Sequence, residues 1–249
     1  GFIGKNNDKI VDLTRFLGEH SKSPLMDDAY YELGNSYVRA DKNDEALETF
    51  DNLLKYYKRS SYVPKALLNQ GLIYYNTERD NQALDKYRQV VNEFSNTDEA
   101  KQAVANARQI YVDLGRVDEY ADWVKDISFV NVTDADLDND MYESAEKQYL
   151  QNNRNKAISA FNKYIERFPK GIHSLQANFY LAESLFGENQ QSQTEKFYSY
   201  VINQERNEFT EQALSRLSQV YLEGDNWMKA MPILERLEEQ ADFPQNITF

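Results

Sequence analysis

The stretch that decides the fold is "YELGNSYVRADKNDEALETF", residues 31–50. Gly34 and Tyr37 stand three residues apart, a spacing that places them on one face of a helix, and the polar turn "ADKND" follows. Ala46 and Phe50, four residues apart, give a second helix its own apolar face. The stretch therefore predicts two antiparallel helices whose backbones come close at the small residues Gly34 and Ala46.

This pattern recurs along the chain at steps of 37 residues, with a final step of 36. The first small position lies at Gly34, Gly71, Arg108, Ala145, Ala182 and Ser218, and only the third copy departs from a small residue. An apolar side chain follows sixteen residues later at Phe50, Tyr87, Val124, Phe161, Tyr198 and Leu234. One helix pair cannot bury its apolar face alone, so the copies are expected to stack on one another.

The motif Tyr30-x-x-Leu33-Gly34-x-x-Tyr37, followed by Ala46 and Phe50, resembles the tetratricopeptide repeat, with Tyr30 in place of the usual Trp. The resemblance covers nearly the whole chain and implies an all-α fold. The expected architecture is a right-handed α-solenoid of six stacked helix-turn-helix repeats after a half-repeat. The period exceeds the usual 34 residues. Longer units of this kind resemble those of Gram-negative cell-envelope proteins, namely outer-membrane assembly lipoproteins and Tol–Pal coordinator proteins. The resemblance implies a periplasmic or envelope-associated location, with the cytoplasm as the alternative.

Two irregularities predict how the array is divided. The stretch "DISFVNVT" lacks helical periodicity, and it predicts an irregular junction at 127–136. An N-terminal subarray of a half-repeat and three units would occupy 1–126, and a C-terminal subarray of three units would occupy 137–249. The array is expected to continue beyond the apolar ending "DFPQNITF". Pro232, inside the last expected helix, predicts a kink or a delayed helix start.

Composition excludes several classes of function. The net charge is −13, which opposes nucleic-acid binding and docking on anionic lipid. The chain has no cysteine, so disulfides and thiolate metal sites are excluded. No apolar run is long enough to span a membrane.

No motif carries catalytic or metal-binding chemistry. "DADLDND", residues 134–140, fails as a calcium loop because Asn139 or Met141 stands where glycine is required. The stretch instead predicts a capped, acidic helix start. His20 and His173 lie in expected linkers without an orienting partner, and no glycine-rich phosphate loop occurs. We therefore expect no enzyme activity, no cofactor and no metal.

The remaining candidate is a binding surface, which in this family is the concave groove lined by the first helix of each unit. Carried over by register, the predicted groove residues are Tyr31, Asn35, Arg39, Leu72, Tyr75, Asn76, Gln109, Asp113, Tyr142, Glu146, Tyr149, Phe179, Glu183 and Phe186. The basic clamp with which co-chaperones of this family hold a carboxylate is missing, since its places read Tyr31, Asn35, Asn69, Gln102 and Asn106.

The groove composition predicts a protein or peptide partner with apolar anchors and some positive charge. The aromatic residues would anchor the partner, and the acids Asp113, Glu146 and Glu183 would select its charge. An alternative is that the aromatics only pack between units. A second alternative is a structural spacer or assembly segment of a longer array, which would act through its ends or its convex face.

Overall fold

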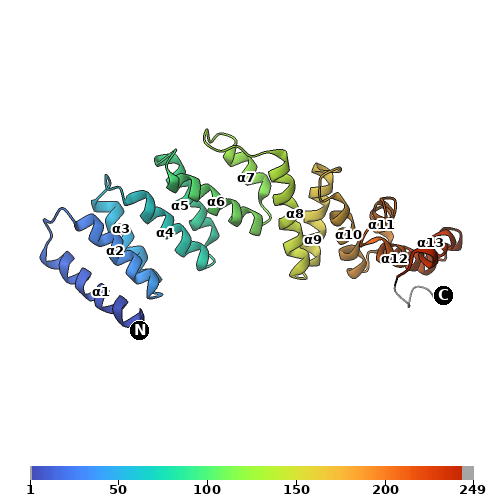
Figure 1. Cartoon of the computed structure of the whole chain (residues 1–249), viewed down its shortest axis with the longest axis horizontal. Coiled ribbons are helices and arrows are strands. Elements are labelled where there is room, and N and C mark those ends of the chain that lie inside the picture. The colour runs from blue at the N-terminus through green and yellow to red at the C-terminus, as the bar shows by residue number, and fades with distance from the viewer. Residues whose placement is uncertain (1, 243–249) are drawn as a thin grey trace. The chain divides into compact units, whose positions relative to one another are not determined.

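The computed structural model describes the backbone of residues 2–242 and the side chains of residues 6–242. Regular structure within this range is helical (Figure 1). The described residues form two compact units. The first unit runs up to Tyr111 and includes Asp122–Asn131, and the second comprises Val112–Ala121 and the described chain from Val132 onward.

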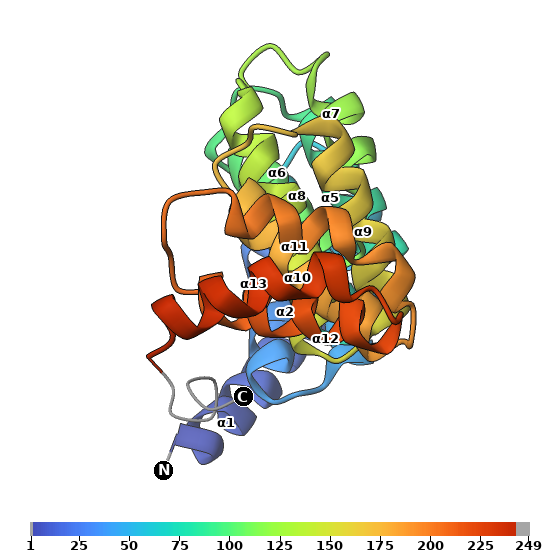
Figure 2. The same cartoon turned by 90° about the vertical axis from the view of Figure 1, so that its right-hand side faces the viewer.

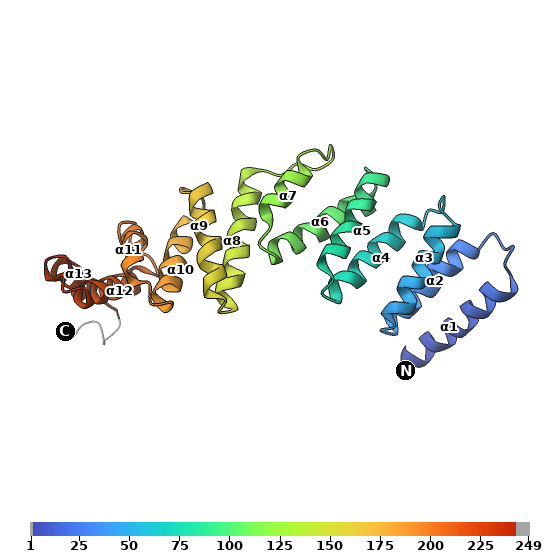
Figure 3. The same ribbon diagram turned by 180° about the vertical axis from the view of Figure 1, so that it is seen from behind.

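The first unit consists of successive helix pairs behind a single leading helix. Its helices are α1 (Phe2–Glu19), α2 (Met26–Arg39), α3 (Asn43–Tyr56), α4 (Val63–Asn76) and α5 (Asp80–Glu93). Figure 3 shows α2 beside α3 and α4 beside α5. Helix α1 packs on α2 as the second helix of a half-repeat would, in agreement with the sequence. Two further helices, α6 (Asp98–Asp113) and α7 (Val117–Val124), contribute residues to both units.

The second unit contains three more helix pairs. Its helices are α8 (Asp134–Leu150), α9 (Arg154–Arg167), α10 (Ser174–Gly187), α11 (Glu195–Ile202), α12 (Thr210–Glu223) and α13 (Trp227–Gln240), with the 3-10 turn η1 (Gln191–Gln193) before α11. Figure 2 shows α12 and α13 lying side by side. We call α2, α4, α6, α8, α10 and α12 the first helices, and their partners the second helices.

The turns inside the helix pairs confirm the six-copy register. Each turn holds one residue with a positive φ angle, in the left-handed (αL) region of backbone conformation. These residues are Asp41, Glu78, Gly115, Asn152, Asn189 and Asp225. These residues repeat at the steps found in the sequence. The residue after each αL position can close the preceding helix: Lys42 N–H donates to Tyr37 O at 2.9 Å, a bond typical of the Schellman motif.

The glycines at the first small position of the repeat allow the close helix contact that the spacing predicted. A Cβ atom added at Gly34 would lie 2.7 Å from Cζ of Phe50, and one at Gly71 would lie 2.8 Å from Cζ of Tyr87. Phe50 is fully buried, and Tyr87 is 1% exposed. The second helix therefore packs its large ring directly on the backbone of the first helix.

Substitution of Gly34 by alanine is expected to destabilise the first unit by up to about 2 kcal/mol. The added methyl group would overlap the Phe50 ring, and this overpacking outweighs the roughly 1 kcal/mol by which alanine favours a helix. Gly18→Ala is the matched control, because no atom lies within 4 Å of its added Cβ. Urea unfolding should show opposite signs for the two variants, and a stabilising Gly34→Ala would contradict the close approach.

A recurring contact ties three of the first helices, α2, α8 and α12, to the linker behind their helix pairs. Asp27 accepts a hydrogen bond from Ser60 Oγ at 2.6 Å, and Asp138 accepts one from Ile172 N–H at 2.9 Å. Glu211, at the same register, accepts from Asp242 N–H at 2.9 Å. In these three helix pairs, one acid at the start of the first helix holds the linker that leads out of the pair.

Other expectations have mixed outcomes. Helix α8 begins at Asp134 with Thr133 as its N-cap in a capping box with Asp136, which confirms the capped acidic start. Of the two alternatives expected at Pro232, the delayed helix start is wrong, because α13 already begins at Trp227 and includes the proline, and the kink stays a prediction. The subarray boundaries stay a prediction. The ending 242–249, from which a further helix was expected, lies outside the described residues except for Asp242.

Candidate binding surface

In the first unit, the predicted groove residues lie on α2 and α4 with unequal exposure. Asn69 Nδ2 donates to Asn35 Oδ1 at 2.8 Å, so these two amides join neighbouring first helices. Leu72 is 43% exposed, and Arg39 and Asn76 are exposed as well. Tyr75 is partly buried on α4, and Gln109 is exposed on α6. These residues share a face of the first helices.

Three of the predicted aromatic anchors pack between successive helix pairs. Each stacks on the ring of the residue that precedes the next first helix. The stacked pairs are Tyr31 with Tyr62 at 4.7 Å, Tyr142 with His173 at 4.2 Å, and Phe179 with Phe209 at 4.4 Å between ring centroids. Tyr62, His173 and Phe209 immediately precede α4, α10 and α12.

This stacking corrects the prediction for two residues. Tyr142 is 8% exposed and Phe179 is 4% exposed, so neither ring is available to anchor a partner. Burial, followed by the hydrogen bond to Glu146, raises the pKa of Tyr142. The packing alternative applies to these two rings, because the ring at the start of the next first helix covers them. Tyr31 remains partly exposed.

The predicted acids also differ in role. Glu183 accepts hydrogen bonds from Tyr198 Oη at 2.6 Å and Gln212 Nε2 at 3.0 Å, and it pairs with Arg216 at 3.4 Å. Asp113 pairs with Lys147 at 2.6 Å. Their charges are compensated within the protein, so neither is a free selector of partner charge. Glu146 accepts from Tyr142 Oη at 2.7 Å and stays partly exposed.

A smaller set of partly exposed residues remains on successive first helices of the second unit. Tyr149 of α8 and Tyr180 of α10 approach with ring centroids 4.6 Å apart. Arg216 of α12 lies over the Phe186 ring at 4.4 Å. Burial and nearby carboxylates raise the pKa of both tyrosines, Glu183 acting on Tyr149 and Glu146 on Tyr180. We call Tyr149, Tyr180, Phe186 and Arg216 the first-helix face.

Sequence reasoning missed Tyr180 and Arg216. Tyr180 follows the predicted groove residue Phe179, and Arg216 lies on α12, which contributes no residue to the predicted set. The aromatic or imidazole ring before three of the first helices was a usable signal. It recurs 31 or 30 residues after the place occupied by Tyr31, Tyr142 and Phe179.

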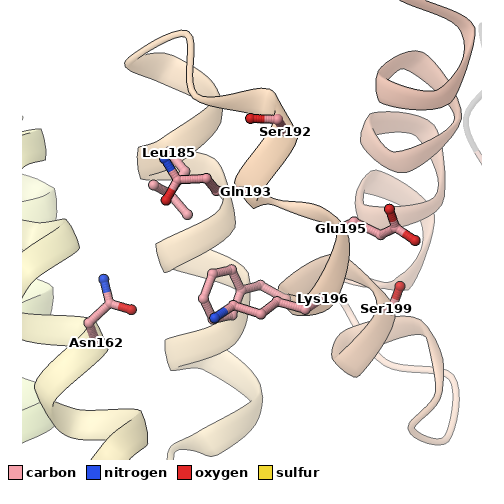
Figure 4. A pocket seen from close by; sticks show the side chains of 8 residues that line it. Asn162, Leu185, Ser192, Gln193, Glu195, Lys196 and Ser199 are labelled. Atoms are coloured by element: carbon pink, nitrogen blue, oxygen red, sulfur yellow. The ribbon is translucent and has the colours of Figure 1, made fainter. Parts of the chain in front are cut away.

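The second helices frame a different opening (Figure 4). A cavity of about 500 Å³ is lined by Asn162, Leu185, Ser192, Gln193, Glu195, Lys196, Phe197 and Ser199. Glu195 and Lys196 point to opposite sides of α11 in Figure 4. Lys229 donates to Glu195 at 2.6 Å and lowers the pKa of that carboxyl, while Lys196 Nζ lies 4.4 Å from the centroid of the Phe197 ring. The charged groups of this opening already have partners.

Within residues 2–242, no group of three or more His, Cys, Asp or Glu side chains could hold a metal ion. The helices of the described range include none that is long and apolar enough to cross a membrane.

Comparison with known proteins places the repeat in a family. Residues 31–100 and residues 141–171 match family models described as tetratricopeptide repeat. No curated protein matches the chain. A tetratricopeptide repeat protein from Parabacteroides merdae is 15% identical, with 98% of this chain and 90% of that chain covered and a TM-score of 0.44.

Two further solved structures are similar at the same low level. The TPR2AB domain of yeast Sti1, in complex with a pHSP90 partner, is 14% identical, with 96% and 86% of the two chains covered and a TM-score of 0.42. PilW, a type IV pilus biogenesis factor, is 13% identical, with 90% and 98% covered and a TM-score of 0.38. Residues 31–100 and 141–171 therefore carry tetratricopeptide repeats, and the helix pairs of the described residues recur with the same helix-turn-helix pattern.

Proposed function

We propose that the protein is a non-catalytic scaffold that binds a protein or peptide on the first-helix face of its second unit. The observation that carries this proposal is the partial exposure of Tyr149, Tyr180 and Phe186 on the consecutive first helices α8 and α10. Aromatic side chains and arginine are the residue types that dominate binding energy at protein interfaces. The tetratricopeptide repeat fold supports the general class, protein–protein interaction.

The charges around this face support a partner with basic residues. Glu183 and Arg216 compensate each other, whereas Glu146 is partly exposed and Glu208 is exposed. Both glutamates lie close enough to Tyr180 to raise its pKa, after the larger effect of burial. A peptide with apolar anchors flanked by Lys or Arg would match this arrangement. The basic residues proposed for the partner are inferred from Glu146 and Glu208. Asp113 and Glu183 no longer support them, because their charges are compensated within the protein.

A displayed library of random peptides tests the proposal without a known partner. The protein should enrich sequences that combine aromatic or aliphatic residues with Lys or Arg. Tyr149→Ser and Phe186→Ser should each weaken binding of the enriched peptides about tenfold, which corresponds to about 1.4 kcal/mol. Met228→Ser is the matched control, because this 90% exposed apolar side chain lies on α13, away from the face.

Two results would contradict the binding proposal. The first is a library from which nothing is enriched over an unrelated helical protein. The second is an equal loss of binding for Met228→Ser and Tyr149→Ser, which would indicate general adhesion to apolar side chains. Both serine variants should keep the helical circular dichroism of the wild type, so that a loss of binding is not a loss of fold.

A second candidate function is that of a spacer or assembly segment, and the end of the second unit favours it. Trp227, Met228 and Met231 on α13 are 60%, 90% and 52% exposed. An apolar cluster of this kind can serve as an interface with another helical element. Self-association that grows with protein concentration and disappears in Met228→Ser would support this function. The periplasmic or cell-envelope location stays a prediction from the family resemblance, with the cytoplasm as its alternative.

A further inference from the structure

A cavity of about 270 Å³ lies between the α6–α7 turn and the helices α8 and α9 of the second unit. It is lined by Asp113, Leu114, Gly115, Ser144, Gln148, Lys156, Ser159, Ala160 and Lys163. All of these residues belong to the same compact unit. The space corresponds to about nine water molecules at roughly 30 Å³ each, so it can hold a small organic group.

The residues at this place in the repeat register account for the space. Ser144 stands at a position where three of the other five copies hold a leucine that is at most 5% exposed, and the five residues are Leu33, Gln70, Ala107, Leu181 and Leu217. Serine is much smaller than leucine, so the interior is left unfilled here. Gly115, Ser159 and Ala160 are small as well, and they enlarge the same space.

Ser144 is itself an unusual wall residue. The residue is 3% exposed, and its Oγ has no hydrogen-bond partner within the described part of the chain. A Cβ atom added at Gly115, another lining residue, would lie 3.6 Å from Ser144 Oγ, so the hydroxyl is directed toward the cavity side of the turn. Buried hydroxyl groups normally have partners, and a bound polar group would supply the missing one.

The charges at the cavity are positive, in contrast to the rest of the protein. Lys156 and Lys163 line it from α9, two helical turns apart, and neither has an ion pair among the described residues. The carboxylate of Asp113, also at the cavity, is compensated by Lys147 at 2.6 Å. The net charge of the whole chain is −13, so a locally positive cavity is not a general property of this surface.

We propose that this cavity binds a carboxylate attached to a short apolar group. The ammonium groups of Lys156 and Lys163 would attract the carboxylate, with the hydroxyl and amide groups of Ser144, Ser159 and Gln148 as hydrogen-bond donors. Leu114 and Ala160 provide apolar wall for the attached group. This site is separate from the first-helix face, and it does not depend on the function proposed for that face. The carboxylate can belong to a free organic acid or to the C-terminus of a peptide.

Titration of the full chain with isovalerate, followed by backbone amide chemical shifts, tests the proposal. Saturable shifts are expected at Gly115, Ser144 and Ser159, with a Kd on the order of 1 mM for a ligand of this size. Isovaleramide has almost the same shape without the charge, and it should bind at least tenfold more weakly. A dipeptide ending in leucine, with a free or an amidated C-terminus, distinguishes the two sources of the carboxylate.

Variants of the lining residues make the test specific. Ser144→Leu introduces the side chain that three of the other copies hold at this position, and it should abolish binding by filling the space. The double variant Lys156→Gln/Lys163→Gln should weaken isovalerate binding about tenfold or more, whereas Lys170→Gln, an exposed lysine outside the lining, should leave it unchanged. The double variant decides the question if Ser144→Leu does not fold.

Three results would overturn the site. One is the absence of saturable shifts in both carboxylate titrations, which would indicate a cavity that holds only water. Another is equal binding of isovalerate and isovaleramide, which would remove the role of the lysines. The third is unchanged binding in the double lysine variant.

Discussion

Raising the pH above about 10 is expected to unfold the second unit before its buried tyrosines ionise in the folded state. Burial raises the pKa of Tyr142, Tyr164 and Tyr198, and hydrogen bonds to Glu146, Asp138 and Glu183 add to the effect. Tyrosine in an unfolded chain has a pKa of about 10. Their contribution to stability is therefore complete below pH 10 and is lost as the pH rises toward the folded-state pKa values.

The size of this effect follows from proton linkage. Between pH 10 and the folded-state pKa values, the unfolded chain binds fewer protons than the folded one, so stability falls with rising pH. Each tyrosine contributes a slope of about 1.4 kcal/mol per pH unit, and three contribute about 4 kcal/mol per pH unit. A unit of ordinary stability, about 5–15 kcal/mol, would unfold within roughly one to four pH units.

Tyrosinate absorbance and helical circular dichroism, recorded together against pH, check this expectation. The two signals should change in one cooperative step. Tyr198→Phe removes one of the three groups and should reduce the slope by about 1.4 kcal/mol per pH unit. Tyr56→Phe is the control, because Tyr56 is 60% exposed and should leave the slope unchanged. A gradual rise of tyrosinate absorbance near pH 10 with intact helices would contradict the argument.

Replacement of Asp138 by alanine is expected to destabilise the second unit by about 3–4 kcal/mol. This 5% exposed carboxylate accepts hydrogen bonds from Tyr164 Oη at 2.5 Å and from Ile172 N–H at 2.9 Å. Hydrogen bonds to a charged group contribute about 1.5–3 kcal/mol each, and the variant leaves the buried Tyr164 hydroxyl and the partly buried Ile172 N–H without this acceptor. Gly171 is required beside it, since an added Cβ would lie 2.5 Å from both Asp138 Oδ2 and Tyr164 Oη.

Urea unfolding of a small set of variants separates this contact from a general effect of charge. Asp134→Ala, at an exposed position of the same helix, should change stability by no more than about 1 kcal/mol. Tyr164→Phe removes one donor, and its combination with Asp138→Ala should show a coupling energy above about 0.5 kcal/mol. A loss below 1 kcal/mol for Asp138→Ala would show that the linker is held by other contacts.

The helix pairs and their register were predictable because they depend on local spacing. Gly34 and Phe50 are sixteen residues apart, and the same spacing recurs at Gly71 and Tyr87. The glycine, the ring and the turn between them belong to one helix pair, so the pattern of that pair contains the information. The αL residue of each turn repeats with the same steps and confirms the inference.

The exposure of the candidate site was less predictable, because it depends on the helix pair that follows. Tyr142 has the residue type of an anchor, yet His173 covers it from 31 residues away. Glu183 was expected to select the charge of a partner. Its carboxylate instead accepts hydrogen bonds from Tyr198 and Gln212 and pairs with Arg216. A register assigns each side chain to a face of its own helix. The register does not show which side chains of the neighbouring helix pair cover that face.

The αL turn residues have a consequence for how such a chain can change in length. Each turn between Asp41 and Asp225 closes its helix pair with backbone hydrogen bonds, and its sequence is free to vary, as Asp, Glu, Gly and Asn all occupy the αL place. An insertion or deletion of one complete period, cut at two such turns, would leave every ring opposite a small residue. A cut of any other length would place large side chains against each other. Tandem duplication in whole periods is therefore the change in length that this architecture tolerates best.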